Sequence, residues 1–205
     1  MKLSGDTIKK MLSEGKLIRD GEELVNQVGP NSIDVKLGRG FKRLRAPRSG
    51  VIDFAEQQEY EYIEEGVDGS IVLPSHSFAL GTTAEYVDLP ANICARIDGR
   101  SSRARLGLVV QTAGTINAGM RGNITLELTN LCDYPIRLRP GDSVAQIEFE
   151  LLDQPASLPY QGAYQGQEGT TGSRLPRMDF WVFGSKEKGR HLWGGGQFFV
   201  WWIYN

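Results

Sequence analysis

The sequence has few residues of the kinds that hold metals or form disulfides. Among 205 residues it contains two cysteines, Cys94 and Cys132, and two histidines, His76 and His191. Two cysteines cannot build a disulfide framework, and each lies in an apolar run, so we expect two buried free thiols. A zinc site that activates water needs clustered His and Cys ligands. The histidines are far apart and the cysteines form no C-x-x-C pair, so we expect no zinc and no other metal held by the protein.

Long apolar runs and an excess of positive charge are also missing. The formal net charge is -2, whereas a nucleic-acid partner normally requires a basic face. No apolar run approaches the ~20 residues that span a bilayer, and no signal peptide is recognisable. We therefore expect a cytoplasmic protein with neither a nucleic-acid nor a membrane partner.

Short alternating runs make up most of the chain. A hydrophobic content of 40% in 205 residues suffices for one substantial core. Ser4 is placed to cap a helix from about Gly5 to Leu12, with Gly15 as its stop. From about Asn31, runs such as SIDVKLG, ICARIDGR, ITLELTN and SVAQIEFELL are separated by Gly, Pro and Asp. This pattern predicts a mainly β fold, an antiparallel sandwich or jelly roll.

The composition changes sharply near residue 176, so we divide the chain into a domain over 1–175 and an extension over 176–205. All four tryptophans lie in the extension: Trp181, Trp193, Trp201 and Trp202. Its run QFFVWWIYN is apolar and uncharged, and three glycines precede it. The extension is expected to add a strand to a sheet edge, pack on a neighbouring subunit or hold a lid. The alternative is an extension without a selected role.

Residues 99–130 carry the strongest chemical signal. Three arginines and two serines in GRSSRARLGL offer the donors that hold phosphate oxygens. In ITLEL the apolar residues alternate with Thr125 and Glu127, so these two share one face of a predicted strand. A phosphorylated ligand close to a carboxylate on a rigid element is the expected arrangement.

The runs GRSSRARLGL, TAGTINAG and ITLELTN resemble the dCTP deaminase branch of the dUTPase-like superfamily. The blocks GPNSIDVKLG, FALGTTAEYVDLP, RPGDSVAQIEF and PYQGAYQGQEG extend this resemblance over most of the chain. It implies a distorted jelly roll or β-barrel with a short N-terminal helix, assembled as a homotrimer with nucleotide sites at subunit interfaces. It also implies hydrolytic deamination of dCTP to dUTP and ammonia, a step towards dTTP.

The resemblance assigns roles to individual residues. Glu127 becomes the general base and then acid, acting on a water that no metal binds, while Mg²⁺ enters only through the triphosphate. The catalytic set is Glu127, Ser101, Arg105 and Ala113, the last through its carbonyl. The substrate-binding set is Arg100, Ser101, Ser102, Arg103, Ala104, Arg105, Asn117, Thr125, Leu126, Glu127, Gln146, Tyr160 and Gln167. Feedback inhibition by dTTP is common among similar proteins and is a further expectation.

Two departures from the family pattern bear on the reaction, one on its product and the other on substrate binding. Asn117 stands where an Asp is usual and cannot remove a proton, so we expect the reaction to stop at dUTP. Ala163 stands where a Lys is common, which predicts weaker triphosphate binding. The alternatives are a bifunctional dCTP deaminase/dUTPase that forms dUMP, a plain dUTPase, and a catalytically weakened nucleotide-binding regulatory protein.

Overall fold

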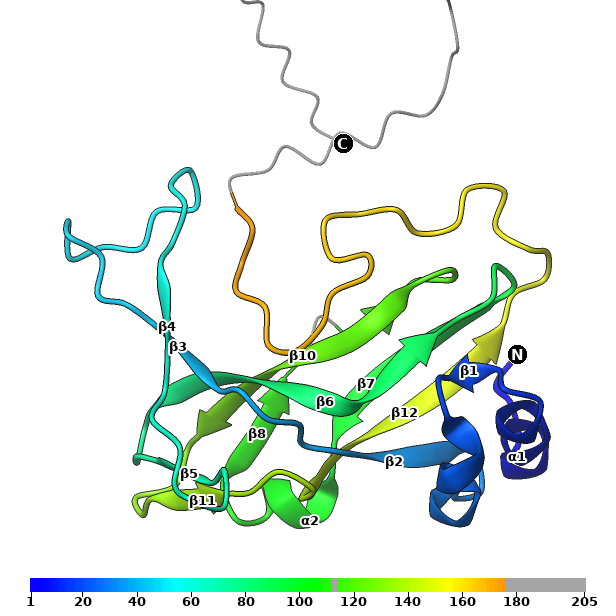
Figure 1. The fold of residues 1–205 in the computed structure, drawn as a ribbon, viewed down its shortest axis with the longest axis horizontal. Coiled ribbons are helices and arrows are strands. Elements are labelled where there is room, and N and C mark those ends of the chain that lie inside the picture. The colour runs from blue at the N-terminus through cyan, green and yellow to red at the C-terminus, as the bar shows by residue number, and fades with distance from the viewer. Residues whose placement is uncertain (112–113, 176–205) are drawn as a thin grey trace, which may run out of the picture.

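Antiparallel strands dominate the chain, as the sequence predicts. The computed structural model describes residues 1–111 and 114–175, so Ala113 and the extension 176–205 lie outside the described residues. Within that part, the strands form sheets of six, two and four strands (Figure 1). The larger sheets run in the order β4-β3-β6-β10-β8, with β1 beside β6, and β2-β12-β7-β9; β11 pairs with β5.

The elements have the following bounds: α1 Gly5–Ser13, β1 Leu17–Ile18, 3₁₀ helix η1 Gly21–Gln27, β2 Ser32–Lys36, β3 Lys42–Leu44, β4 Tyr60–Tyr62, β5 Ile71–Leu73, β6 Phe78–Asp88, β7 Ile93–Gly99, α2 Ser101–Ala104, β8 Leu108–Gln111, β9 Thr115–Ile116, β10 Arg121–Asn130, β11 Ile136–Leu138 and β12 Ser143–Leu151.

The core lies between the two larger sheets, which both contribute buried residues to a single apolar cluster. Strand β10 pairs with β6 on one side and β8 on the other. Its buried positions alternate with half-buried ones, so Leu126 and Leu128 point into the core while Thr125 and Glu127 point to the other face. The predicted sharing of one face by Thr125 and Glu127 is confirmed.

Helix α1 follows from its capping signals. The side chain of Ser4 accepts a hydrogen bond from the backbone N of Thr7 at 3.4 Å. Ile8 and Leu12 are fully buried, and the helix packs against η1, β1 and β2. Gly15 has φ of +69° just after the helix, a conformation that favours glycine. None of the helices in residues 1–111 and 114–175 is long and apolar enough to cross a membrane.

The two cysteines are free but only half-buried, which corrects the expectation of buried thiols. Cys94 occupies a position of β7 whose neighbours Ile93 and Ala95 point inward, so its own side chain points outward. Cys132 follows β10 in a bend. An apolar run therefore did not determine the burial of every residue within it.

The chain leaves β12 and returns across β10 as an irregular segment, visible in yellow to orange in Figure 1. We call residues 159–175 the C-terminal cover. Gly166 N donates to Arg121 O at 2.8 Å, and Asn123 N donates to Gln167 O at 3.0 Å. Backbone hydrogen bonds of this kind hold the cover against the start of β10 and enclose a space below it.

Candidate active site

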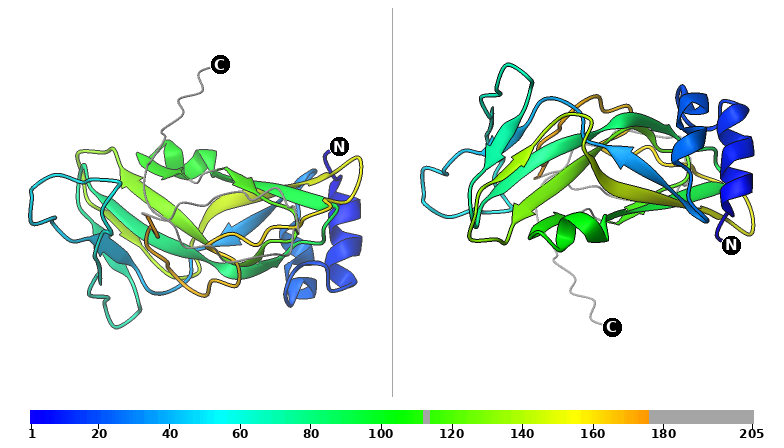
Figure 2. Two further views of the ribbon diagram at one scale, coloured as in Figure 1. Left: turned by 90° about the horizontal axis from the view of Figure 1, so that it is seen from above. Right: turned by 90° about the horizontal axis from the view of Figure 1, so that it is seen from below.

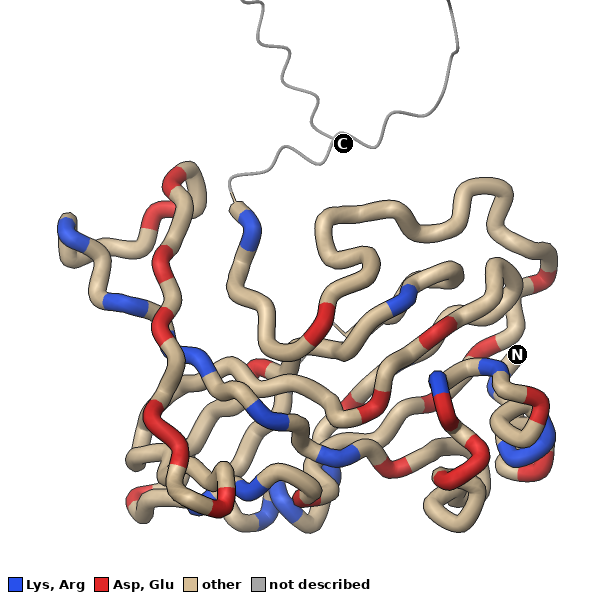
Figure 3. Tube along the Cα trace, viewed as in Figure 1, with Lys and Arg blue, Asp and Glu red and all other residues tan. Residues whose placement is uncertain are grey.

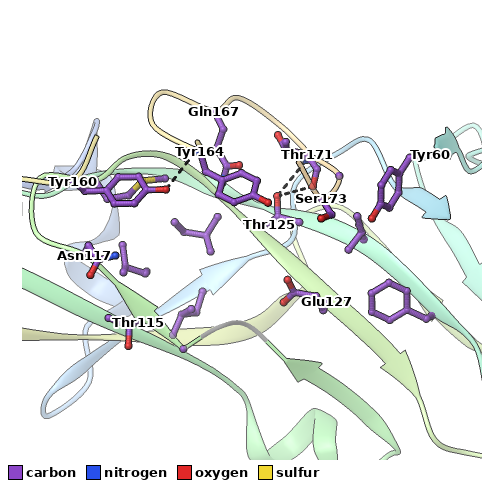
Figure 4. Close-up of a pocket in the computed structure, with 18 residues that line it drawn as sticks. Tyr60, Thr115, Asn117, Thr125, Glu127, Tyr160, Tyr164, Gln167, Thr171 and Ser173 are labelled. Carbon is purple, nitrogen blue, oxygen red and sulfur yellow. Dashed lines mark hydrogen bonds between the residues drawn. The ribbon is translucent and has the colours of Figure 1, made fainter. Parts of the chain in front are cut away.

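A cavity of about 450 Å³ lies between the face of β10 that carries Glu127 and the C-terminal cover (Figure 4). Its walls come from β4, β6, β7, β9, β10 and the cover. The lining residues are Tyr60, Phe78, Leu80, Ile97, Gly114, Thr115, Ile116, Asn117, Met120, Ile124, Thr125, Glu127, Tyr160, Tyr164, Gln167, Thr171, Gly172 and Ser173. The space is large enough for a small polar ligand with one aromatic ring.

Glu127 is the one carboxylate among the described residues that line the cavity. Its Oε2 atom is buried and has no hydrogen-bond partner among the described residues. Burial raises the pKa of Glu127 above its ordinary value because an ionised carboxylate loses solvation, and a backbone hydrogen bond only partly opposes this. A carboxyl group with a raised pKa holds a proton more readily than an ordinary carboxylate, which suits a group that must both take up and release one as a general base and acid.

The cover is hydrogen-bonded to the same face of β10. The backbone N of Thr171 donates to Thr125 Oγ1 at 3.2 Å, and that hydroxyl lies 3.4 Å from Thr171 O. Gln167 Nε2 donates to Asn123 O at 2.6 Å. Figure 4 shows Thr171 and Ser173 above Thr125, with Glu127 further along the strand. These contacts fix the roof of the cavity next to the carboxylate.

The turn after β9 forms the opposite end. Asn117 lines the cavity, and its carbonyl accepts a hydrogen bond from Met120 N at 3.1 Å. Tyr160 N donates to Ala118 O at 2.8 Å, which places the Tyr160 ring above Asn117 (Figure 4). The hydroxyl of Tyr160 accepts a hydrogen bond from Tyr164 N at 3.3 Å. This end therefore combines an amide with two aromatic rings.

The structure brings together five of the residues predicted for the site. They come from β10, the turn after β9 and the cover: Asn117, Thr125, Glu127, Tyr160 and Gln167. Leu126 was predicted to bind substrate, but its side chain is fully buried in the core, so only its backbone faces that region. Ala113 lies outside the described residues.

The remaining predicted residues form a separate group around α2 and β12: Arg100, Ser101, Ser102, Arg103, Ala104, Arg105 and Gln146. Arg100 pairs with Asp34 at 2.7 Å, and Gln146 is the register partner of Asp34. Arg105 Nε donates to Ser101 Oγ at 3.3 Å. Figures 1 and 2 place α2 on the opposite side of the molecule from the cover. Within one chain, this basic group does not line the cavity.

Sequence reasoning missed part of the cavity wall. Tyr60 and Phe78 come from β4 and β6, far from residues 99–130, and no spacing pattern connects them to Glu127. Tyr164, Thr171 and Ser173 lie in the cover, within or just after the block PYQGAYQGQEG, and that block was the available signal. In residues 1–111 and 114–175 no three His, Cys, Asp or Glu side chains cluster in a way that could hold a metal.

Comparison with known proteins places this arrangement in a family. The model of the dCTP deaminase-like family matches residues 2–152. The chain belongs to the dCTP deaminase-like family. It is 40% identical to "dCTP deaminase, dUMP-forming" of Methanobrevibacter smithii over 77% of this chain and 84% of that protein. It is 41% identical to the protein of the same description in Dictyoglomus thermophilum over 88% of this chain and 97% of that protein.

A solved structure supports the family assignment and the fold. The crystal structure of 2'-deoxycytidine 5'-triphosphate deaminase from Agrobacterium tumefaciens matches 73% of this chain at 27% identity, with a TM-score of 0.57. This chain spans 47% of that longer chain. The mainly β, dUTPase-like fold with a short N-terminal helix, expected from the sequence, is confirmed.

Proposed function

We propose that this family member deaminates dCTP and carries the product on to dUMP. The observation that carries the proposal is the name shared by relatives about 40% identical over most of their length, "dCTP deaminase, dUMP-forming". These names favour the bifunctional alternative over the dUTP end product expected from Asn117. The overall conversion consumes two waters and releases ammonia and pyrophosphate.

The first step uses the buried carboxylate. Glu127 takes a proton from water as the water oxygen bonds to C4 of the cytosine ring, and it passes that proton to N3. It then takes the remaining proton of the new C4 hydroxyl and delivers it to N4, so that the C4–N4 bond breaks, ammonia leaves and the C4 carbonyl of uracil forms. Two observations support this role: Oε2 is buried without a hydrogen-bond partner among the described residues, and burial raises the pKa of Glu127, so the carboxylate is a stronger base than an exposed one. Leu80, which is buried, and Phe78, which is partly exposed, give the cavity an apolar wall in addition to its polar groups.

The second requirement is positive charge for the triphosphate. The arginines predicted to bind it surround α2, on the side of the molecule away from the cavity (Figure 3). A second copy of the chain can supply them, so we propose a homotrimer whose sites combine the cavity of one subunit with residues 100–105 and Gln146 of another. Mg²⁺ enters bound to the phosphate oxygens, and dTTP is a candidate inhibitor of the same site.

One residue favours a second candidate function, a deaminase that stops at dUTP. Asn117 lines the cavity at the end below Tyr160. Its neutral amide can accept a hydrogen bond from a sugar hydroxyl but cannot take a proton from the water that attacks the α-phosphate. A regulatory protein that binds dCTP without converting it shares this supporting feature.

The deciding experiment gives purified protein dCTP and Mg²⁺ and separates dCTP, dUTP and dUMP over time, with Glu127→Gln as the control. Accumulation of dUMP without dUTP supports the bifunctional enzyme, provided that the control forms neither product. Accumulation of dUTP alone would replace it by the second candidate. Nucleotide binding without either product would leave the regulatory protein, and added dUTP tests the second step separately.

A further inference from the structure

Arg174 lies at the edge of the cavity on the C-terminal cover. It directly follows Ser173, which lines the cavity, and its guanidinium carbon is 5.5 Å from the centroid of the Tyr164 ring, another lining residue. Its backbone N donates to the Tyr164 hydroxyl at 3.3 Å, and its Nη1 donates to the carbonyl of Ala163. Stacking and hydrogen bonding therefore hold this cation at the edge of the cavity.

The charge of Arg174 is not neutralised within the described part of the chain. Arg100 pairs with Asp34 and Arg121 pairs with Asp88, but Arg174 has no ion pair with any described carboxylate, including Glu168, the other charged residue of the cover. The hydrogen bond to the Ala163 carbonyl leaves its positive charge intact and uses one of its five donors, and no other side-chain hydrogen bond of Arg174 is made to the described residues. Such a guanidinium suits a phosphate.

The described residues that line the cavity include no cation. Neither Lys nor Arg is among them, and Glu127 is the one acidic residue of this described lining. A nucleotide whose base lies against Glu127 must direct its phosphates toward the opening, because burial of several negative charges beside a carboxylate is unfavourable. Among the basic residues of this chain, Arg174 is the one on the cover, whereas many of the others gather around α2 (Figure 3).

Arg174 also revises the expectation drawn from Ala163. The absence of a Lys at residue 163 predicts a missing triphosphate contact. In the structure, the guanidinium of Arg174 is hydrogen-bonded to the carbonyl of Ala163, so a cation occupies the surroundings of that position. The residue that carries this positive charge, Arg174, lies eleven positions after Ala163 in the sequence.

We propose that Arg174 binds the phosphate chain of the nucleotide and supplies the positive charge that Ala163 does not. This inference rests on the proposed function, since it takes a deoxycytidine nucleotide as the ligand. Arg174 acts on binding and discriminates between nucleotides by their number of phosphates. It is not part of the proton transfer at Glu127.

The test measures equilibrium binding by calorimetry, in a Glu127→Gln background that prevents turnover. The ligands are dCTP with Mg²⁺, dCMP and deoxycytidine. Because a charge-assisted hydrogen bond is removed, Arg174→Gln is expected to weaken dCTP binding by about 10- to 100-fold. Binding of dCMP is expected to weaken less, and binding of deoxycytidine is expected to be unchanged. Adding Ala163→Lys to Arg174→Gln is expected to restore most of the dCTP affinity.

Arg19→Gln is the matched control. The Arg19 guanidinium carbon lies 3.5 Å from the centroid of the Tyr86 ring, so this arginine also stacks on tyrosine, but it does not line the cavity. Its replacement is expected to leave all three affinities unchanged. An equal loss for dCTP and deoxycytidine in Arg174→Gln would show that Arg174 only holds the cover in place, and no loss for dCTP would also overturn the inference.

The same experiments separate this inference from the proposed function. If the protein forms product from dCTP and Arg174→Gln changes neither product formation nor dCTP binding, the inference alone is overturned. Binding of dCTP that depends on Arg174, without product in the protein that retains Glu127, would overturn the proposed function alone. Failure of all three ligands to bind would overturn both.

Discussion

Gly172 is the point at which the cover passes closest to the wall of the cavity. A Cβ atom at residue 172 would lie 2.6 Å from Cε2 and 2.9 Å from Cγ of Tyr60, well inside ordinary van der Waals contact. Because Cγ is the ring atom nearest the backbone, rotation of the ring about its own axis does not relieve this overlap. We predict that Gly172→Ala pushes the cover away from Tyr60 and opens the cavity.

The expected effect is an increase in KM for dCTP with little change in kcat. Overpacking at a tight contact costs about 1–3 kcal/mol, which shifts the equilibrium between the closed and open cover by about 5- to 150-fold. If the substrate is held only under the closed cover, its apparent affinity falls in proportion to the closed fraction, and therefore by at most the same factor. Saturating dCTP closes the cover again, so the chemical step is retained.

Steady-state kinetics of three variants tests this reasoning. Gly172→Ala with Tyr60→Ala removes the ring that the new methyl group meets, so the double variant is expected to have a lower KM than Gly172→Ala alone. Gly29→Ala is the control, because its nearest neighbour, Ser32 O, lies 3.5 Å from the added atom and Gly29 does not line the cavity. An unchanged KM in Gly172→Ala, or a double variant no better than the single one, would refute the argument.

Three further predictions follow from the same site. Glu127→Gln should abolish deamination yet increase the free energy of unfolding at neutral pH, because the raised pKa of Glu127 makes its ionisation costly in the folded state; urea titrations should show the gain shrinking as the pH is lowered through the raised pKa and absent below about pH 4, where the carboxyl is protonated in both the folded and the unfolded chain. Asn117→Asp should increase the ratio of dUMP to dUTP, measured by chromatography. Thr125→Val removes hydrogen bonds to Thr171 worth about 1 kcal/mol, so limited proteolysis within the cover should accelerate.

Patterns of a few neighbouring residues predicted the faces of strands and the ends of helices. Alternation in ITLEL placed Thr125 and Glu127 on one face of β10, and Ser4 marked the start of α1. The prediction that Cys94 is buried was wrong because it ignored this alternation. An apolar run that forms a strand has outward positions as well as inward ones. The alternation within a run is therefore more informative than the number of apolar residues it contains.

Proximity in sequence was misleading for the site. Residues 100–105 lie shortly before Glu127 in the sequence, and this short separation suggests that they form one cluster. The chain, however, passes through β8 and β9 before it enters β10. This path leaves α2 on one side of the molecule and the C-terminal cover on the other (Figures 1 and 2). Conversely, Tyr60 and Phe78 reach the cavity through the order of strands in the sheet. Phe78 is in β6, which pairs with β10, and Tyr60 is in β4, which is joined to β6 through β3. No short sequence motif contains these non-local pairings.

The cover and the carboxylate of Glu127 are thermodynamically linked. Thr171, Gly172 and Ser173 close the same cavity in which Glu127 Oε2 lies buried, so closure of the cover increases the loss of solvation that raises the pKa of Glu127. Linkage requires the converse, that protonation of Glu127 favours the closed cover. A phosphate chain that draws the cover shut would then also raise the pKa of Glu127 further and make its carboxylate a stronger base. Binding at the opening and acid–base chemistry on β10 thus depend on one conformational equilibrium, which the contacts of Thr125 with Thr171 and of Tyr60 with Gly172 determine.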